Sequence, residues 1–208
     1  MKPWELFKLI EDTEYISGGD DVQFAVKPVE EEKAIYLLFQ ESTSKRDWQV
    51  NLDFPVKVYK QQQKFFLVHR GWAKAWKSIN DMVFTELLKV IQGKEDWKII
   101  VAGWSYDGAM SLLAAEDYFF RFKKPVGEVI TFGGPKPLFG FYTRHYFKKA
   151  AEKFYQYEFS YDFVTWCVPL PFYMRCGNNI IDKKNCWKLW RVFQTGKWHC
   201  AYGDAEYY

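Results

Sequence analysis

This chain of 208 residues lacks the features that mark several large classes of protein. No stretch approaches the ~20 consecutive apolar residues that a transmembrane helix needs. Its 29 basic and 26 acidic residues are interspersed, without the basic stripe that nucleic-acid binding usually requires. Internal repeats, low-complexity tracts and long linkers rich in proline and glycine are also missing. We therefore expect one globular domain over residues 1–208, with no transmembrane segment and no nucleic-acid partner.

The first residues lack the apolar core of a signal peptide, because acidic side chains appear by Glu11 and Asp12. We therefore expect a cytoplasmic protein, or an exported one if a leader has been removed. Cysteine is scarce, and no two cysteines form a Cys-x-x-Cys pair, so we expect no metal site. We interpret the cysteines as reduced thiols, with one or two disulfides as the alternative. All fall in the last quarter of the chain: Cys167, Cys176, Cys186 and Cys200.

Aromatic residues, in contrast, are abundant. The chain has 10 Trp, 14 Tyr and 19 Phe, which together make up 21% of its residues. Large flat side chains fill cores, line apolar clefts and sit at membrane surfaces. Composition alone leaves these uses open, although core packing is the commonest of them.

Apolar patterning predicts alternating strands and helices through the middle of the chain. Short apolar runs predict strands, and apolar residues that recur every three or four positions predict amphipathic helices. The strands are expected at 34–39, 64–69, 98–102, 126–132 and 154–160, and the helices at 71–92, 109–122 and 143–153. This order predicts a mostly parallel central sheet, connected by right-handed crossovers and covered by helices on both faces.

Ser105 stands between the strand predicted at 98–102 and the helix that follows, with Gly103 two residues before it. This is the setting of a nucleophile elbow, in which a serine on a sharp strand-to-helix turn projects above the sheet. The N-terminus of the helix would point at the serine, so the backbone N–H of Tyr106 would help to bind an oxyanion. The strict Gly-x-Ser-x-Gly pattern is not met, because Asp107 takes the place of the second glycine. An ordinary turn is the alternative.

A catalytic triad on this kind of sheet follows the chain order Ser, Asp, His. Asp162 comes just after the extended segment that ends at Ser160, where the carboxyl end of a strand would present it. Of the three histidines, His69, His145 and His199, only His199 follows Asp162. These residues therefore predict a triad acid and base, with a turn residue and a surface histidine as the alternatives.

The chain also carries an ordered set of short motifs. They are LFQESTSKRDW (38–48), VHRGW (68–72), AGWSYDGA (102–109), TFGGPK (131–136), YDFV (161–164) with PLP (169–171), and HCAY (199–202). In this order they resemble the blocks of the class 3 lipases, the family of the fungal triacylglycerol lipases, over about residues 34–208. Each block is common by itself, whereas the ordered set is not.

The resemblance implies an α/β-hydrolase fold and a serine esterase or lipase that needs no metal or organic cofactor. It assigns Ser105 as the nucleophile, His199 as the general base and then acid, and Asp162 as the residue that orients the histidine. The oxyanion hole would be Ser42, through its backbone N–H and hydroxyl, together with the backbone N–H of Tyr106. The substrate would be a carboxylic ester with an acyl chain.

The segment 45–54 allows two interpretations. Its apolar residues alternate from Trp48 to Phe54, which taken alone predicts a half-buried strand. The resemblance instead places the family's lid here, and it implies that Trp48 and Trp104 contact the substrate or the lid. Such a lid would cover the apolar cleft in water and lie on a lipid surface when open. Peripheral contact with a lipid surface is therefore expected.

Three departures from the family pattern keep a second hypothesis open. Glu41 stands beside the oxyanion residue, and Trp104 and Asp107 replace the histidine and the glycine that are usual in the elbow. A carboxylate pointed at the oxyanion would oppose its charge. The alternative is therefore a catalytically weak or inactive relative that binds a lipid or a protein.

Overall fold

The computed structural model describes residues 1–19, 22–40, 56–61, 64–159, 162–166, 172–176, 179–182 and 200–205. Within these ranges, no helix has both the length and the apolar character needed to cross a membrane. The candidate lid, 45–54, and three candidate site residues, Ser42, Trp48 and His199, lie outside the described residues.

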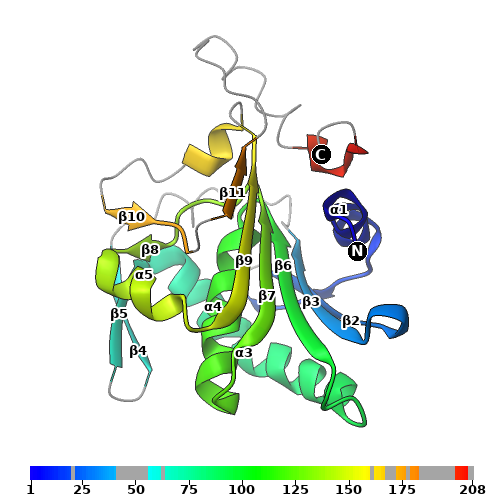
Figure 1. Ribbon diagram of the computed structural model, residues 1–208. Coiled ribbons are helices and arrows are strands. Elements are labelled where there is room, and N and C mark those ends of the chain that lie inside the picture. Colours follow the sequence, from blue (N-terminus) through cyan, green and yellow to red (C-terminus); the bar gives the residue numbers. More distant parts are fainter. Residues whose placement is uncertain are drawn as a thin grey trace.

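Seven strands of the described chain form one central sheet, in the order β1-β2-β3-β6-β7-β9-β11 (Figure 1). The pairs from β3 to β11 are all parallel, whereas β1/β2 and β2/β3 are antiparallel. This is the mostly parallel sheet that the sequence predicts. Its strands are β1 (Ile16–Ser17), β2 (Gln23–Val29), β3 (Ala34–Gln40), β6 (Lys98–Trp104), β7 (Val126–Phe132), β9 (Ala151–Glu158) and β11 (Asn179–Asp182).

Helices cover both faces of this sheet, as predicted. On one face, α3 (Arg70–Ile91) and α4 (Asp107–Phe122) pack against strand side chains such as Leu37. On the other face, α1 (Pro3–Asp12) packs against the alternate strand residues such as Tyr36. Because successive residues of a strand point to opposite faces, each central strand contributes to two separate cores.

A second sheet in the described residues has the order β10-β8-β5-β4, and all its pairs are antiparallel. The expectation that residues 64–69 join the parallel sheet is therefore wrong: Leu67 pairs with Val58, and Val68 with Leu138. A short apolar run predicts a strand but not its partner. The strands are β4 (Val56–Gln61), β5 (Lys64–His69), β8 (Leu138–Phe139) and β10 (Tyr173–Met174).

The boundary between the last predicted helix and strand also differs. The helix α5 spans Phe141–Phe147 instead of 143–153, and β9 begins at Ala151 instead of Phe154. The reason is pairing along the whole edge of β7: Val126 is the register partner of Ala151, and the N–H of Val126 donates to the oxygen of Ala150 at 2.9 Å. Strand pairing thus begins where the sequence pattern predicts helix.

A buried carboxylate joins α3 to α4. Asp117 on α4 is buried and accepts hydrogen bonds from Trp76 Nε1 of α3 at 3.1 Å and from Arg121 Nε at 3.0 Å. The other side of the Arg121 guanidinium contacts Asp81 of α3 at 3.0 Å. Burial of a carboxylate is costly unless it is hydrogen-bonded, so the buried half of this network depends on the packing of the two helices.

We expect Asp117→Ala to lower the free energy of unfolding by about 2–4 kcal/mol, because it leaves the buried Trp76 N–H and part of Arg121 without an acceptor. The control is Asp81→Ala, since Asp81 is 88% exposed and should cost less than about 1 kcal/mol. Urea unfolding of the two variants measures both values. Equal losses of unfolding free energy would show that the buried contacts of Asp117 stabilise the packing of α3 on α4 no more than the exposed contact of Asp81 does.

Candidate functional site

Ser105 lies in the turn between β6 and α4, with a backbone φ of 56°. This left-handed conformation costs a residue with a side chain on the order of 1–3 kcal/mol. Hydrogen bonds hold it in place: the Ser105 N–H donates to the oxygen of Phe132 at 2.8 Å, and the Gly108 N–H donates to the oxygen of Ser105 at 3.0 Å. Ser105 itself is buried, with 2% of its surface exposed. Its backbone has the geometry of a nucleophile elbow.

Close packing explains the glycines around the elbow. A Cβ added at Gly103 would overlap the backbone oxygen of Asp107, the first residue of α4. On the other side of the turn, a Cβ added at Gly108 would lie 3.0 Å from the Cα of Gly134, which follows β7. The start of α4 therefore sits against the ends of two strands, at a distance that side chains at these positions would prevent.

Tyr106 is the N-cap residue of α4, directly after Ser105. Its side chain is buried, and its ring lies 5.7 Å from the ring of Trp72 on α3. The partial positive charge at a helix N-terminus favours negative charge nearby, so the expected oxyanion residue stands at a suitable place. Trp104, at the end of β6, packs edge-on against Phe7 of α1 at 5.2 Å. Contact of Trp104 with a substrate stays a prediction.

Asp107, the main departure in the elbow, is the first residue of α4 and is fully buried. A carboxylate in the first turn of a helix is electrostatically favourable. It lies near Tyr15, since burial first and the Asp107 charge second raise the pKa of that tyrosine. Asp107 is therefore accommodated inside the fold at the base of the turn.

Asp162 follows β9 and is also fully buried. One carboxylate oxygen accepts the hydroxyl of Tyr202 at 2.8 Å, and the other accepts the backbone N–H of Val164 at 3.0 Å. The loop is closed by backbone contacts, in which the Asp162 oxygen accepts from Thr165 Oγ1 at 2.8 Å and the Asp162 N–H donates to Phe159 at 2.9 Å. The side chain is thus held in one orientation at the end of its strand.

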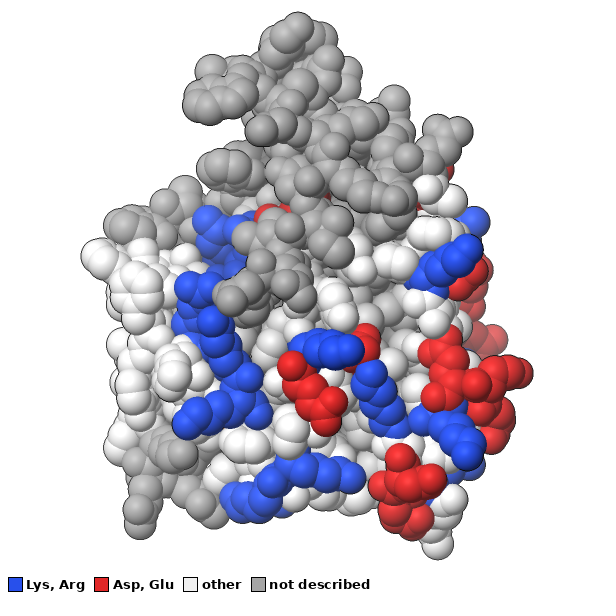
Figure 2. Space-filling model, in the orientation of Figure 1, with Lys and Arg blue, Asp and Glu red and all other residues white. Residues whose placement is uncertain are grey.

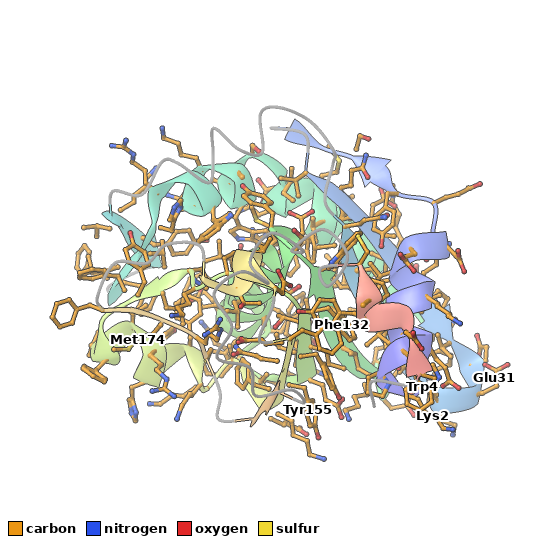
Figure 3. The ribbon with its side chains drawn as sticks, turned by 90° about the horizontal axis from the view of Figure 1, so that it is seen from above. Lys2, Trp4, Glu31, Phe132, Tyr155 and Met174 are labelled. Carbon is orange, nitrogen blue, oxygen red and sulfur yellow. The ribbon has the colours of Figure 1, made fainter. Side chains whose placement is uncertain are left out.

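Tyr202 connects the end of the described chain to the sheet and to α1. Its ring stacks on Phe159 at 4.4 Å and lies 5.8 Å from Phe7 and 5.9 Å from Phe132. Figure 3 shows the turn Ala201–Gly203 beside α1, whose Trp4 is labelled. Burial, and then the Asp162 carboxylate, raise the pKa of Tyr202 well above its ordinary value. The sequence motif HCAY contains this tyrosine, but the sequence assigned it no role.

An ion pair also supports the loop that contains Asp162 and Thr165. Arg175 pairs with Glu158, the last residue of β9, and donates to the backbone oxygen of Thr165. Burial lowers the pKa of Arg175, against the opposing charge of Glu158. Sequence patterns single out neither residue, because the two are 17 positions apart and meet only after the sheet forms. In the described residues, no group of three or more His, Cys, Asp or Glu is placed to hold a metal ion.

The sheet order brings Ser105 and Asp162 to one edge. They follow β6 and β9, which flank β7 and run parallel to it. Parallel strands lie ~4.8 Å apart, so the two chain positions are separated by about 10 Å. In the triad that the sequence predicts, a third side chain would bridge them. His199, the predicted bridge, lies outside the described residues, whereas His69 is buried against Trp72 at 4.0 Å and His145 is exposed on α5.

The parallel sheet, the helices on both its faces and the serine elbow at its carboxyl edge define an α/β-hydrolase. Solved structures share this fold. Lipase II from Rhizopus niveus matches with a TM-score of 0.72 and 22% identity, over 88% of this chain and 71% of that one. A triacylglycerol lipase whose catalytic centre is described as a serine protease triad matches with a TM-score of 0.71 and 21% identity, over 83% and 66%.

The family described as Lipase (class 3) matches residues 36–171, which is most of the chain. The curated Rhizopus niveus lipase is 28% identical over 137 residues, which cover 63% of this chain and 35% of the relative. The Rhizomucor miehei lipase is 30% identical over 101 residues, which cover 49% and 28%. The chain belongs to the class 3 lipase family, and it spans about a third of the length of these curated relatives.

We expect Tyr202→Phe to lower the free energy of unfolding by about 1–3 kcal/mol at neutral pH. The change leaves one oxygen of the buried Asp162 carboxylate without its donor and removes an acceptor from the Phe159 N–H. Urea unfolding measures the loss. Tyr142→Phe, at an exposed position of α5, is the matched control and should leave the value nearly unchanged.

The same variant should also change how the free energy of unfolding depends on pH under alkaline conditions. Because the pKa of Tyr202 in the folded protein lies above its unfolded value, the folded chain keeps a proton that the unfolded chain loses. This stability is complete below pH ~10 and falls above it, by about 1.4 kcal/mol per pH unit for one tyrosine. Tyr202→Phe should remove that part of the slope between about pH 10 and 11. An unchanged slope would mean that Tyr202 ionises as readily in the folded protein as in the unfolded chain.

Proposed function

We propose that this protein hydrolyses carboxylic esters through an acyl-enzyme on Ser105. The observation that carries the proposal is the φ of 56° at a serine between a parallel strand and a helix. Left-handed backbone at a residue with a side chain is uncommon, and such strain gathers at active sites. Two hydrogen bonds and close glycine contacts hold this conformation, so it belongs to the fold.

The surroundings of Asp162 support it as the triad acid. Its carboxylate is buried at the edge of the sheet that carries Ser105, and its two oxygens accept from Tyr202 and Val164. Tyr202, which is tied to Asp162, is only three residues from His199 along the chain. This short connection supports His199 as the base between Asp162 and Ser105.

In the proposed reaction, Ser105 Oγ attacks the ester carbonyl carbon while His199 takes the hydroxyl proton. The tetrahedral intermediate collapses, the bond to the alcohol breaks, and the histidine returns the proton to the leaving alcohol. Water then attacks the acyl-enzyme by the same route and releases the acid. The backbone N–H of Tyr106 at the start of α4, with Ser42 as the second donor, would bind the oxyanion.

We propose an ester with an acyl chain as the substrate class, because the relatives in this family are named lipases, one of them a triacylglycerol lipase. Residues 45–54 as a lid, with Trp48 on its apolar side, and a cytoplasmic location stay predictions from the sequence.

A fluorophosphonate probe tests the nucleophile directly, because it labels only an activated serine. We expect the protein to be labelled and Ser105→Ala to lose both labelling and hydrolysis of p-nitrophenyl esters, with its circular dichroism unchanged. Ser78→Ala, on the surface of α3, is the control and should keep both. Labelling of Ser105→Ala, or activity within tenfold of the parent, would remove Ser105 from this role.

The triad is tested by Asp162→Asn and His199→Ala. Each should reduce kcat by about 10⁴, because the acid fixes the tautomer of the imidazole that takes the proton. The double variant should be little worse than the worse single variant, since the residues act as a unit. His145→Ala, on the exposed face of α5, is the control histidine. Additive losses in the double variant would contradict the triad.

A further inference from the structure

Large apolar side chains are exposed together on one part of the molecule. Between 38% and 70% of the surface of each is exposed, and they come from β4, β5, the start of α5 and the residue before β10. We call this set the apolar face: Val58, Phe65, Leu67, Phe141, Tyr142 and Phe172. Elsewhere in the described chain, the large exposed apolar residues are Met1, Ile16 of β1, and Met82 and Leu88 of α3. Clustered exposure of this kind marks an interaction surface.

Contacts within the fold hold the apolar face together. Val58 and Leu67 are register partners on β4 and β5, and the Leu67 N–H donates to Thr143 Oγ1 of α5 at 3.1 Å. Phe172 lies 6.1 Å from the ring of Phe139, the last residue of β8. The second sheet and α5 therefore present these side chains as one surface.

Phe172 also has an uncommon backbone. Its φ is 76°, a region that bulky residues rarely adopt. The Gly140 N–H donates to its backbone oxygen at 2.9 Å, which ties this turn to the start of α5. Backbone strain that exposes an aromatic ring to water has no benefit for the core.

The charge of the chain segments that build this part of the molecule is one-sided. Residues 55–80 and 129–151 contain ten of the 29 basic residues and none of the 26 acidic ones, so the rest of the chain is net negative. In Figure 2, a band of Lys and Arg runs down the left of the molecule, where Figure 1 places α5, and most Asp and Glu lie at the right, near α1 and β2. Lys148 and Lys149, directly after α5, are exposed members of this set.

We infer that the apolar face docks on an anionic phospholipid surface. Phenylalanine and tyrosine rings insert at the boundary between head groups and acyl chains, and neighbouring lysines and arginines are attracted to anionic head groups. A second copy of this chain fits less well, because a symmetric dimer through this face would bring its two basic bands together. The apolar face and the basic band therefore match a surface that is both apolar and negative.

This inference goes beyond the proposed function, because binding requires no turnover of substrate. The Ser105→Ala protein is therefore the form to use, so that no lipid is consumed during the measurement. Failure of binding would leave the hydrolysis proposal standing, and inactive Ser105 would leave the docking proposal standing.

Sedimentation with large unilamellar vesicles tests the proposal. We expect binding to an equimolar mixture of phosphatidylcholine and phosphatidylglycerol, weaker binding to phosphatidylcholine alone, and loss of binding at high salt. Phe141→Ser with Tyr142→Ser, and separately Lys148→Glu with Lys149→Glu, should each weaken binding by about tenfold or more. Because these side chains are exposed, circular dichroism should show the fold unchanged.

Two matched double variants serve as controls. Met82→Ser with Leu88→Ser removes two exposed apolar side chains of α3, and Lys8→Glu with Lys27→Glu reverses two charges near the opposite face. Both should bind vesicles as the parent does. Equal binding by the face variants and the controls would overturn the proposal. So would a dimer in sedimentation velocity that the Phe141 and Tyr142 change abolishes, since the occupant would then be a second copy.

Discussion

The backbone turn at Ser105 is the constraint on which the rest of the site depends. A non-glycine residue at a φ of 56° is unfavourable by itself, so the surrounding structure must hold it. The hydrogen bonds to Phe132 and from Gly108 supply part of that restraint. Close approach supplies the rest, since the first turn of α4 lies directly against Gly103 and Gly134. Glycine is needed at these positions because a side chain would prevent the close approach. This approach also points the N-terminus of α4 at Ser105.

At Asp162, the other candidate residue at this edge of the sheet, the site depends on hydrogen bonds to a buried carboxylate. Asp162 is removed from water, which costs several kcal/mol unless hydrogen bonds replace the lost hydration. Tyr202 and Val164 replace it from two directions. Because Tyr202 also packs on Phe7 of α1, a side chain near the start of the chain supports the tyrosine that holds Asp162. The site is therefore a property of the assembled sheet and not of any one loop.

Features encoded in local runs of residues could be predicted, and features that depend on distant pairing could not. The strand ending at Trp104 and the helices α3 and α4 follow from apolar periodicity within one segment. The strands β1, β8 and β10 have two residues each, too few to show any period. The apolar run of β5 predicted a strand but did not reveal its partner, because such runs occur in both parallel and antiparallel sheets.

The same distinction holds for the candidate site. Ser105 could be predicted because the elbow is a local pattern of strand, glycine, serine and helix. Asp162 could be predicted from chain order, but its bond with Tyr202 joins residues 40 positions apart. The ion pair of Arg175 with Glu158 is equally invisible to periodicity, since a charged residue in a sequence normally indicates an exposed face. The pair forms only because the folded chain brings these two half-buried side chains together.

Asp107 shows how the fold accepts a residue that the chemistry does not favour. At the first position of α4 its carboxylate gains from the positive end of the helix, and this gain is present in the folded protein at all times. An oxyanion on a substrate at Ser105 would face the same helix end, but only during the reaction, and two negative groups there repel each other. In the proposed reaction, the Asp107 charge would therefore oppose the oxyanion in the transition state, and the N–H of Tyr106 would have to offset that repulsion.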